Sequence, residues 1–437
     1  MSLSSPSLDI CINDAEVIGV HRDLCEQYGD FLKGIAKVNE VTRTYKSDIW
    51  ILSEEEEQSS NAEFLSALFS KASCKDSKRC LVVVAGRDKL TCLSKREICN
   101  TIYVQDSELY CSFSENFLTS IYQTEEMKRA LVRMSVHGVC PIIRRKYSEA
   151  KYLSLLSEVI DSDEPMLENR TNTRTKSLIA QRLEYDILGV FPAITHRKLF
   201  FKGVVEELLW FLRGSTDTKE LSKRGIKFWD ANSTREFLDN RGLEEYPVGQ
   251  LGKSYGYQWR HAGGKWSPDN KHESGVDQIK TLVEGIRKEP YSRRHIISNW
   301  VASDIKDIAL PPCHVLAQFI VKEGLLSCIL IQRSADLVLG VPFNVACYTL
   351  LTYLVASACD IVPDRLYHIM NDCHVYENHI KPMKETRIQM YKAPFLASIP
   401  KNLASEILEN KDAKVSYKDF DLKNYTSGSA MKLKMAV

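Results

Sequence analysis

Residues 310–348 constrain the fold most, because a rigid approach, two strand-like runs and the start of an apolar helix follow one another there. The stretch begins LPPCHV and ends QRSADLVLGVPFNVACY. Pro311 and Pro312 each fix their own φ and restrict the residue before them, so they hold Cys313 at a defined point. We therefore expect the rest of the chain to be organised around this thiol.

Other side chains of the same stretch suit nucleophilic chemistry at Cys313. Arg333, with Ser334 beside it, can hold an oxyanion bidentately and can lower the pKa of a nearby thiol. Asn344 follows Pro342 at an expected helix start, and its amide presents a donor beside an acceptor, as the edge of a uracil ring requires. A single cysteine is more often a small buried hydrophobe than a nucleophile, and this context favours the catalytic interpretation.

Length and composition limit the alternatives. A chain of 437 residues is long enough for two domains. A net charge of +1 with 26% charged residues gives no basic stripe, so no nucleic-acid partner is implied. Thirteen cysteines without a C-x-x-C pair predict neither a zinc site nor a disulfide framework, and they indicate reduced thiols in a cytoplasmic location.

We expect neither a secretory signal nor a membrane partner. The start MSLSSPSLDICIND lacks a basic region followed by an apolar core. Residues 342–359 are almost long enough to span a membrane, but Asn344, Ser357 and several tyrosine and threonine hydroxyls lie among them. This segment therefore predicts a buried core helix.

Residues 1–145 differ in character from residues 146–437, so we expect a domain boundary there. Short β-rich runs at residues 9–20, 48–52, 80–85 and 101–113 predict a small α/β domain. The acidic segment 53–63 between two of these runs is expected to be a solvated loop.

The motifs LPPCH, QRSADLVLGVPFN and DCHVYENHI resemble those of thymidylate synthase, and the resemblance extends from about residue 152 to the carboxyl terminus. It implies an α+β / α/β chain: a mixed β-sheet packed with helices, which forms a homodimer through the sheet, behind the small α/β domain. It also implies the reaction, which composition and spacing do not give. In that reaction a methyltransferase converts dUMP to dTMP, with 5,10-methylenetetrahydrofolate donating carbon and hydride and without a metal.

The resemblance assigns catalytic roles to Cys313, Glu207, Tyr255, Asn344 and His314. Cys313 would add to carbon 6 of the uracil, and Tyr255 would help remove the proton from carbon 5. Asn344 and a water network at Glu207 would stabilise charge on the pyrimidine oxygen, while His314 would order water.

A physical argument that does not depend on the resemblance also favours a catalytic role for Glu207. It lies in VVEELLWFLRG, an expected amphipathic helix. A carboxylate partly buried among apolar neighbours favours its protonated form and can shuttle protons near neutral pH. The adjacent Glu206 is interpreted as its surface neighbour.

Further residues match the binding positions of the family. On the nucleotide side these are Arg170, Arg333, Ser334, Asp336, Asn344, His374, Tyr376 and, donated across the dimer, Arg293 and Arg294. On the folate side they are Trp229, Asn232, Asp336, Arg197 and the terminal Val437.

The chain departs from the family pattern in the loop that carries Arg170. Asn172 and Arg174 stand where glycines are usual, which predicts a stiffer loop, although the charge of Arg174 could instead attract an anion. Asn371 also replaces a usual glycine.

The amino-terminal domain carries a weaker resemblance. DICINDAEVIGV resembles the first strand of dihydrofolate reductase, and VVVAGRDK resembles a later one. No Leu-Pro-Trp follows Ile18 and Gly19, however, and no Gly-Gly turn opens a helix to bind phosphate. We expect a divergent or degenerate reductase-like domain that does not bind NADPH, or a plain structural appendage.

Two other functions stay open. In a dUMP hydroxymethylase, water would complete the reaction, but Trp229 and the MAV end favour hydride transfer. A catalytically silent regulatory or binding homologue would fit the altered phosphate loop and the eroded first domain. Retention of Cys313, Glu207 and Asn344 favours an enzyme.

Overall fold

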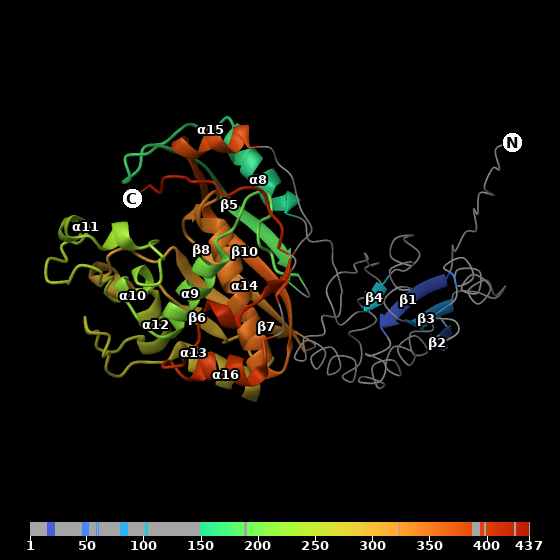
Figure 1. The fold of residues 1–437 in the computed structure, drawn as a ribbon. Helices are drawn as coiled ribbons and strands as arrows, with labels where there is room; N and C mark the ends of the chain where they lie inside the picture. The colour runs from blue at the N-terminus through green and yellow to red at the C-terminus, as the bar shows by residue number, and fades with distance from the viewer. Residues whose placement is uncertain are drawn as a thin grey trace. The chain divides into compact units, whose positions relative to one another are not determined.

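The computed structural model describes residues 15–21, 46–51, 58, 60, 79–85 and 101–103, and all residues from 149 onward except 188–189, 323, 387–393, 397–398, 424 and 437. The chain divides into two compact units, Met1–Arg145 and Lys146–Val437 (Figure 1). Most of the predicted acidic loop, the ends of three predicted β-rich runs at 9–14, 52 and 104–113, and Val437 lie outside the described residues.

The described part of the first unit is a parallel sheet in the order β2-β3-β1-β4. Its strands are β1 (Ala15–His21), β2 (Lys46–Ile51), β3 (Arg79–Ala85) and β4 (Thr101–Tyr103). Each of the four predicted runs contains part of one strand. Parallel pairing requires crossover connections, which is typical of α/β domains.

The second unit is built on a mixed sheet in the order β5-β10-β8-β7-β6, with β9 pairing beside β10. β10 is antiparallel to β5 and parallel to β8, whereas β7 is antiparallel to both β8 and β6. The strands are β5 (Thr175–Asp186), β6 (Ile296–Ser298), β7 (His314–Lys322), β8 (Leu325–Gln332), β9 (Ala335–Asp336) and β10 (Val362–Tyr376). This mixed sheet, packed with helices, confirms the fold class predicted for the second unit.

Helices cover the sheet and fill the rest of the unit (Figure 1). They are α8 (Ala150–Asp161), α9 (Phe201–Leu212), α10 (Lys219–Ser222), α11 (Arg235–Asn240), α12 (Tyr255–His261), α13 (Gln278–Lys288), α14 (Gly340–Cys359), α15 (Glu377–Glu385) and α16 (Lys401–Glu409). Short 3-10 helices η1 (Asp230–Ser233), η2 (Ala302–Asp307) and η3 (Tyr417–Asp419) and the strand pair β11 (Phe395–Leu396) and β12 (Leu422–Lys423) complete the described elements.

Helix α14 forms the centre of the core. It packs against β8, β10, α9 and α16, and Figure 1 shows it lying along the sheet. By length and composition α14 could cross a membrane, but 78% of its apolar window is buried inside the unit. A helix that is apolar on all sides is typical of such a core position, as predicted.

The β7–β8 hairpin brings distant parts of the sequence together. Its side chains alternate, so that Phe319 is buried against the helices while Ile329, on the opposite face, remains partly exposed. Gly324 turns the chain at a φ of 77°, a conformation that glycine adopts without strain. Because Cys313 precedes β7 and Arg333 follows β8, the antiparallel pairing places these two residues side by side.

Candidate active site

The backbone of Cys313 is fixed by hydrogen bonds on both sides. The phenol oxygen of Tyr255, at the start of α12, accepts from the N–H groups of Cys313 and His314 at 2.7 and 3.3 Å. The N–H of Arg333 donates to the Cys313 carbonyl at 3.0 Å. The half-buried thiol is therefore held at one place between the sheet and α12, as the two prolines predict.

Arg333 is immobilised beside that thiol. Its Nε donates to the Pro312 carbonyl at 2.9 Å and its Nη2 to the Pro311 carbonyl at 2.8 Å. The same Nη2 lies 3.8 Å from Cys313 Sγ, and the guanidinium carbon lies 5.6 Å from the ring centre of Trp300. The prolines therefore position both the thiol and the cation next to it.

The electrostatic balance at Cys313 has two opposing parts. Burial raises the pKa of the Cys313 thiol, while the positive charges of Arg333 and Arg170 lower it and Asp336 raises it further. The net direction is upward. The expected activation by Arg333 thus has the predicted sign, but alone it does not outweigh the loss of hydration.

Glu207 lies on α9 in the environment that the apolar helix pattern predicts. Trp229 Nε1 donates to Glu207 Oε1 at 2.8 Å. Burial raises the pKa of Glu207 to about 7, and the hydrogen bond from Trp229 opposes that shift. A carboxyl group with this pKa can both donate and accept a proton near neutral pH.

Glu206 is not the surface residue that we expected. Its side chain is 3% exposed and forms an ion pair with Arg224, and its Oε1 accepts from the Tyr417 N–H at 2.9 Å. The expectation was wrong because both partners are remote in the sequence, and a buried carboxylate requires such partners.

The amide of Asn344 is oriented by a chain of hydrogen bonds. Gln332 Nε2 donates to Asn344 Oδ1 at 3.0 Å, and Gln332 Oε1 lies 2.8 Å from His368 Nε2. With its oxygen engaged in this way, Asn344 presents its NH₂ group as a donor. Sequence reasoning missed Gln332 and His368. Gln332 is the last residue of β8, directly before Arg333, and the strand alternation places its side chain on the buried face.

His314 is held in its neutral form. Burial lowers the pKa of His314 to about 4, against the opposing effect of a hydrogen bond with Asn344. Its Nδ1 is buried and has no partner among the described residues. The ordering of water by His314 stays a prediction.

The loop that carries Arg170 is ordered by its own side chains. Asn169 donates to the Thr173 carbonyl at 2.7 Å and accepts from the Thr171 N–H at 2.9 Å. Asn172 has a φ of 54°, in the left-handed region that asparagine tolerates better than most residues, so it serves where glycine is usual.

Arg174 does not present a free charge to an anion. Its guanidinium pairs with Glu377 at the start of α15, where Nε lies 3.1 Å from Oε2. The Arg174 carbonyl also accepts from the Glu377 N–H at 2.9 Å. The pair anchors the loop and offsets the charge of Arg174, and attraction of an anion by Arg174 stays a prediction.

The pairing of β9 with β10 brings the next predicted residues together. Asp336 and His374 are register partners, and Asp336 Oδ1 accepts from the N–H groups of Val338 and Leu339 at 2.9 and 3.2 Å. His374 Nδ1 lies 2.8 Å from Asp372 Oδ1. Burial, together with the charges of Asp336 and Cys313, raises the pKa of Tyr376, while Arg170 opposes that shift.

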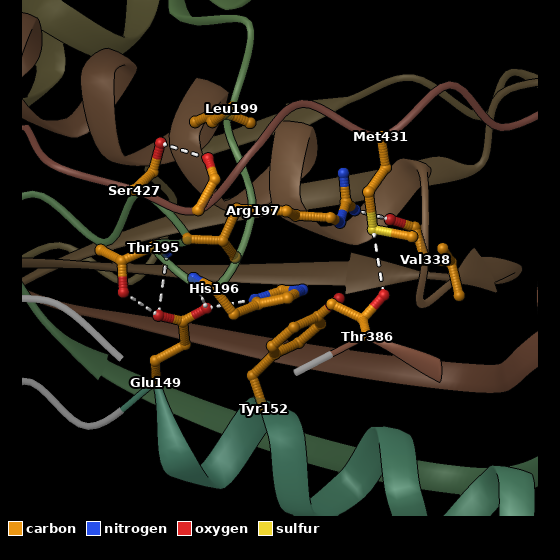
Figure 2. A network of polar contacts seen from close by, with 12 residues as sticks. Glu149, Tyr152, Thr195, His196, Arg197, Leu199, Val338, Thr386, Ser427 and Met431 are labelled. Carbon is orange, nitrogen blue, oxygen red and sulfur yellow. Dashed lines mark hydrogen bonds and ion pairs between the residues drawn. The ribbon is translucent and has the colours of Figure 1, made fainter. Parts of the chain in front are cut away.

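Arg197 lies in a buried polar cluster (Figure 2). Its guanidinium donates to the Val338 carbonyl, and its Nε has no partner among the residues that the structure describes. Nearby, the carboxylate of Glu149 accepts from the N–H groups of Thr195 and His196 at 2.9 and 3.2 Å. Arg197 is 4% exposed, so any folate contact would form from inside this cluster.

The remaining predicted residues occupy separate places. Ser334 is half-buried directly after Arg333, and Asn232 is buried in η1, where its N–H donates to the Trp229 carbonyl at 3.1 Å. Arg293 and Arg294 lie exposed between α13 and β6.

Comparison with known proteins gives matches to one family. The sequence model described as thymidylate synthase matches residues 150–437. The thymidylate synthase of Equine herpesvirus 2 is 41% identical over 293 residues, which cover 67% of this chain and 99% of that protein. That of Ascaris suum is 48% identical over 241 residues, which cover 54% of this chain and 81% of the relative.

Longer relatives match over the same part of the chain. The bifunctional dihydrofolate reductase-thymidylate synthase of Paramecium tetraurelia is 39% identical over 297 residues, or 68% of this chain. Bifunctional dihydrofolate reductase-thymidylate synthase 1 of Arabidopsis thaliana is 42% identical over 294 residues, or 67% of this chain. The matched regions cover 63% and 55% of those two proteins.

Proposed function

The chain belongs to the thymidylate synthase family, and from this premise we propose that it converts dUMP to dTMP with 5,10-methylenetetrahydrofolate. The observation that carries the proposal is the contact of 3.8 Å between Cys313 Sγ and Arg333 Nη2. A thiol held against an immobile cation is suited to act as a thiolate nucleophile.

In the proposed reaction, the sulfur of Cys313 bonds to carbon 6 of the uracil and carbon 5 gains the electron pair. Burial raises the pKa of this thiol because the thiolate loses hydration. The positive charges of Arg333 and Arg170 must therefore offset part of this desolvation when the thiolate forms. Asn344 donates from Nδ2 to the pyrimidine oxygen, since Gln332 already occupies its Oδ1.

Glu207 and Tyr255 would move protons through water at neutral pH. The pKa of Glu207, raised by burial to about 7, suits both directions of transfer. The folate supplies the carbon and the hydride, with Trp229 and Asp336 beside it. The proposed steps require no metal.

We further propose a homodimer whose subunits share their active sites. One face of the β7–β8 hairpin leaves apolar side chains such as Ile320, Ile329 and Ile331 partly exposed, as a sheet-mediated interface requires. Arg293 and Arg294 are exposed and are suited to reach the phosphate in a partner's site across a twofold axis.

The first unit is proposed to bind no nicotinamide cofactor tightly, because no Gly-Gly turn opens a helix for its phosphates. Calorimetric titration of the full chain with NADPH tests this. We expect no saturable heat, and an affinity in the range of about 1 μM would contradict the proposal.

Turnover is the test of the function. The purified chain should produce dTMP and dihydrofolate in equal amounts, and Cys313→Ser should lose at least about 10³-fold in kcat while it still binds dUMP. Cys359→Ser, which alters another half-buried thiol, is the matched control and should remain active. A hydroxymethylated product without dihydrofolate would support the hydroxymethylase, and an inactive wild-type chain would support the silent homologue.

A further inference from the structure

A charged depression lies on the carboxyl-terminal unit, beside α9. Its volume is about 820 Å³, and six cationic side chains line it: Lys202, Arg213, Arg224, Lys411, Lys414 and Lys418. Three carboxylates, those of Glu206, Glu220 and Asp412, also line it, so the cations exceed the carboxylates by three. This excess of positive charge is suited to an anionic ligand.

Two of those carboxylates are already engaged within the protein. Glu206 pairs with Arg224 and accepts from the Tyr417 N–H at 2.9 Å. Glu220 accepts from Asn270 Nδ2 at 3.2 Å. Glu206 therefore compensates Arg224, while Glu220 is held in place by a neutral amide, and the cations of the depression still outnumber its carboxylates.

Among these cations, Arg213 would gain the most from an anionic ligand. Its guanidinium donates to the Val415 carbonyl, and none of the ion pairs among the described residues includes it. Burial and the like charge of Arg224 lower the pKa of Arg213, while the charges of Glu206 and Glu220 oppose that shift. A half-buried guanidinium that forms no ion pair among the described residues gains stability from an anion that contacts it directly.

The depression is separate from the site at Cys313. One face of α9 carries Lys202 and Glu206, and Arg213 follows at the C-terminal cap of the helix. Glu207 lies on another face, where it contacts Trp229. The segment 411–418, which follows α16 and continues into η3, also lines the depression and carries three of the lysines.

We propose that this depression binds the phosphate groups of a polyphosphate-bearing anion of nucleotide size. A guanidinium fork provides paired donors for phosphate oxygens, and several lysines around it match a ligand with more than one charge. The polyphosphate of a nucleotide and inorganic polyphosphate present the same chemistry.

Isothermal titration of the full chain with tripolyphosphate and with ATP tests the proposal, with dUMP present at saturating concentration. The triple variant Lys411→Gln, Lys414→Gln, Lys418→Gln should bind tripolyphosphate at least about tenfold more weakly than the wild type. The matched control Lys280→Gln, Lys288→Gln, Lys381→Gln removes the same number of exposed charges elsewhere and should bind as the wild type does.

The two ligands distinguish the source of the phosphate. Equal affinity would assign the site to the polyphosphate group alone, and tighter binding of ATP would assign it to a nucleotide. No saturable binding of either ligand, or equal loss in the triple variant and the control, would overturn the proposal. Lys418→Glu alone provides the same comparison if the triple variant folds poorly, and circular dichroism monitors the fold.

Discussion

Two adjacent carboxylates on α9 have opposite electrostatic environments. Glu206 is neutralised by Arg224 and bonded by the Tyr417 N–H, so its charge is compensated. Glu207 has a single hydrogen bond from Trp229, and burial raises its pKa to about 7. The second residue therefore exchanges protons in the neutral range, which is why we assign the proton transfers to it.

We predict that Glu207 makes folding stability depend on pH. Its pKa rises from the usual 4.5 to about 7, so between these values the folded chain retains a proton that the unfolded chain has lost. Its contribution to the free energy of unfolding is complete below pH 4.5 and is lost as the pH rises through 7. Glu207→Gln should lack this fall.

Urea unfolding of wild type and Glu207→Gln across this pH range measures the effect, with Glu158→Gln on the exposed side of α8 as the control. The variant should also lose roughly 10² to 10⁴-fold in kcat. Parallel pH profiles for wild type and Glu207→Gln would show that the carboxyl group is not the titrating residue.

Asn344→Asp is predicted to shift preference from the uracil to the cytosine nucleotide. Gln332 holds Oδ1, so the substitution exchanges the donor that faces the base for an acceptor that suits an exocyclic amine. The ratio of kcat/KM for dUMP to that for dCMP should fall at least about tenfold. An unchanged ratio, as expected for the exposed control Asn402→Asp, would remove Asn344 from the base-binding role.

At the scale of elements, the loop that carries Arg170 depends on an anchor outside itself. Arg174 ties the loop to the start of α15 through Glu377, so Arg174→Gln should raise the KM for dUMP and leave kcat nearly unchanged. Because an exposed ion pair contributes little free energy, we expect the KM for dUMP to rise by roughly twofold to fivefold. Glu377→Gln should give the same increase, and the double variant should add nothing further. Fully additive effects would mean that the two side chains act separately.

Local pattern predicts some of these elements and cannot predict others. The burial of β8 follows from sequence because its apolar side chains alternate, and the burial of α14 follows because its apolar run is nearly continuous. The partners of Glu206 and Arg174 do not, since Tyr417 and Glu377 lie 211 and 203 residues away. Gln332 shows both a predictable and an unpredictable feature. Its burial follows from the alternation of β8, whereas its hydrogen bond with His368 depends on the order of the strands.

At the scale of the whole molecule, the first unit has a parallel sheet and the second a mixed sheet, and the predicted chemistry lies in the second unit. The exposed Arg293 and Arg294 are the predicted nucleotide-binding residues that a partner would donate. Our central claim is that Cys313 of one subunit and these arginines of another form one catalytic site.

Mixing two inactive variants tests that claim most directly. Cys313→Ser lacks the nucleophile in every site, and Arg294→Glu places a negative charge beside the phosphate dianion in every site. In a mixed dimer one site collects both defects and the other collects neither. Unfolding and refolding the two variants together should restore about one quarter of the wild-type activity, because roughly half of the dimers are mixed and each has one intact site. Variants that stay inactive after mass spectrometry shows subunit exchange would contradict the shared site.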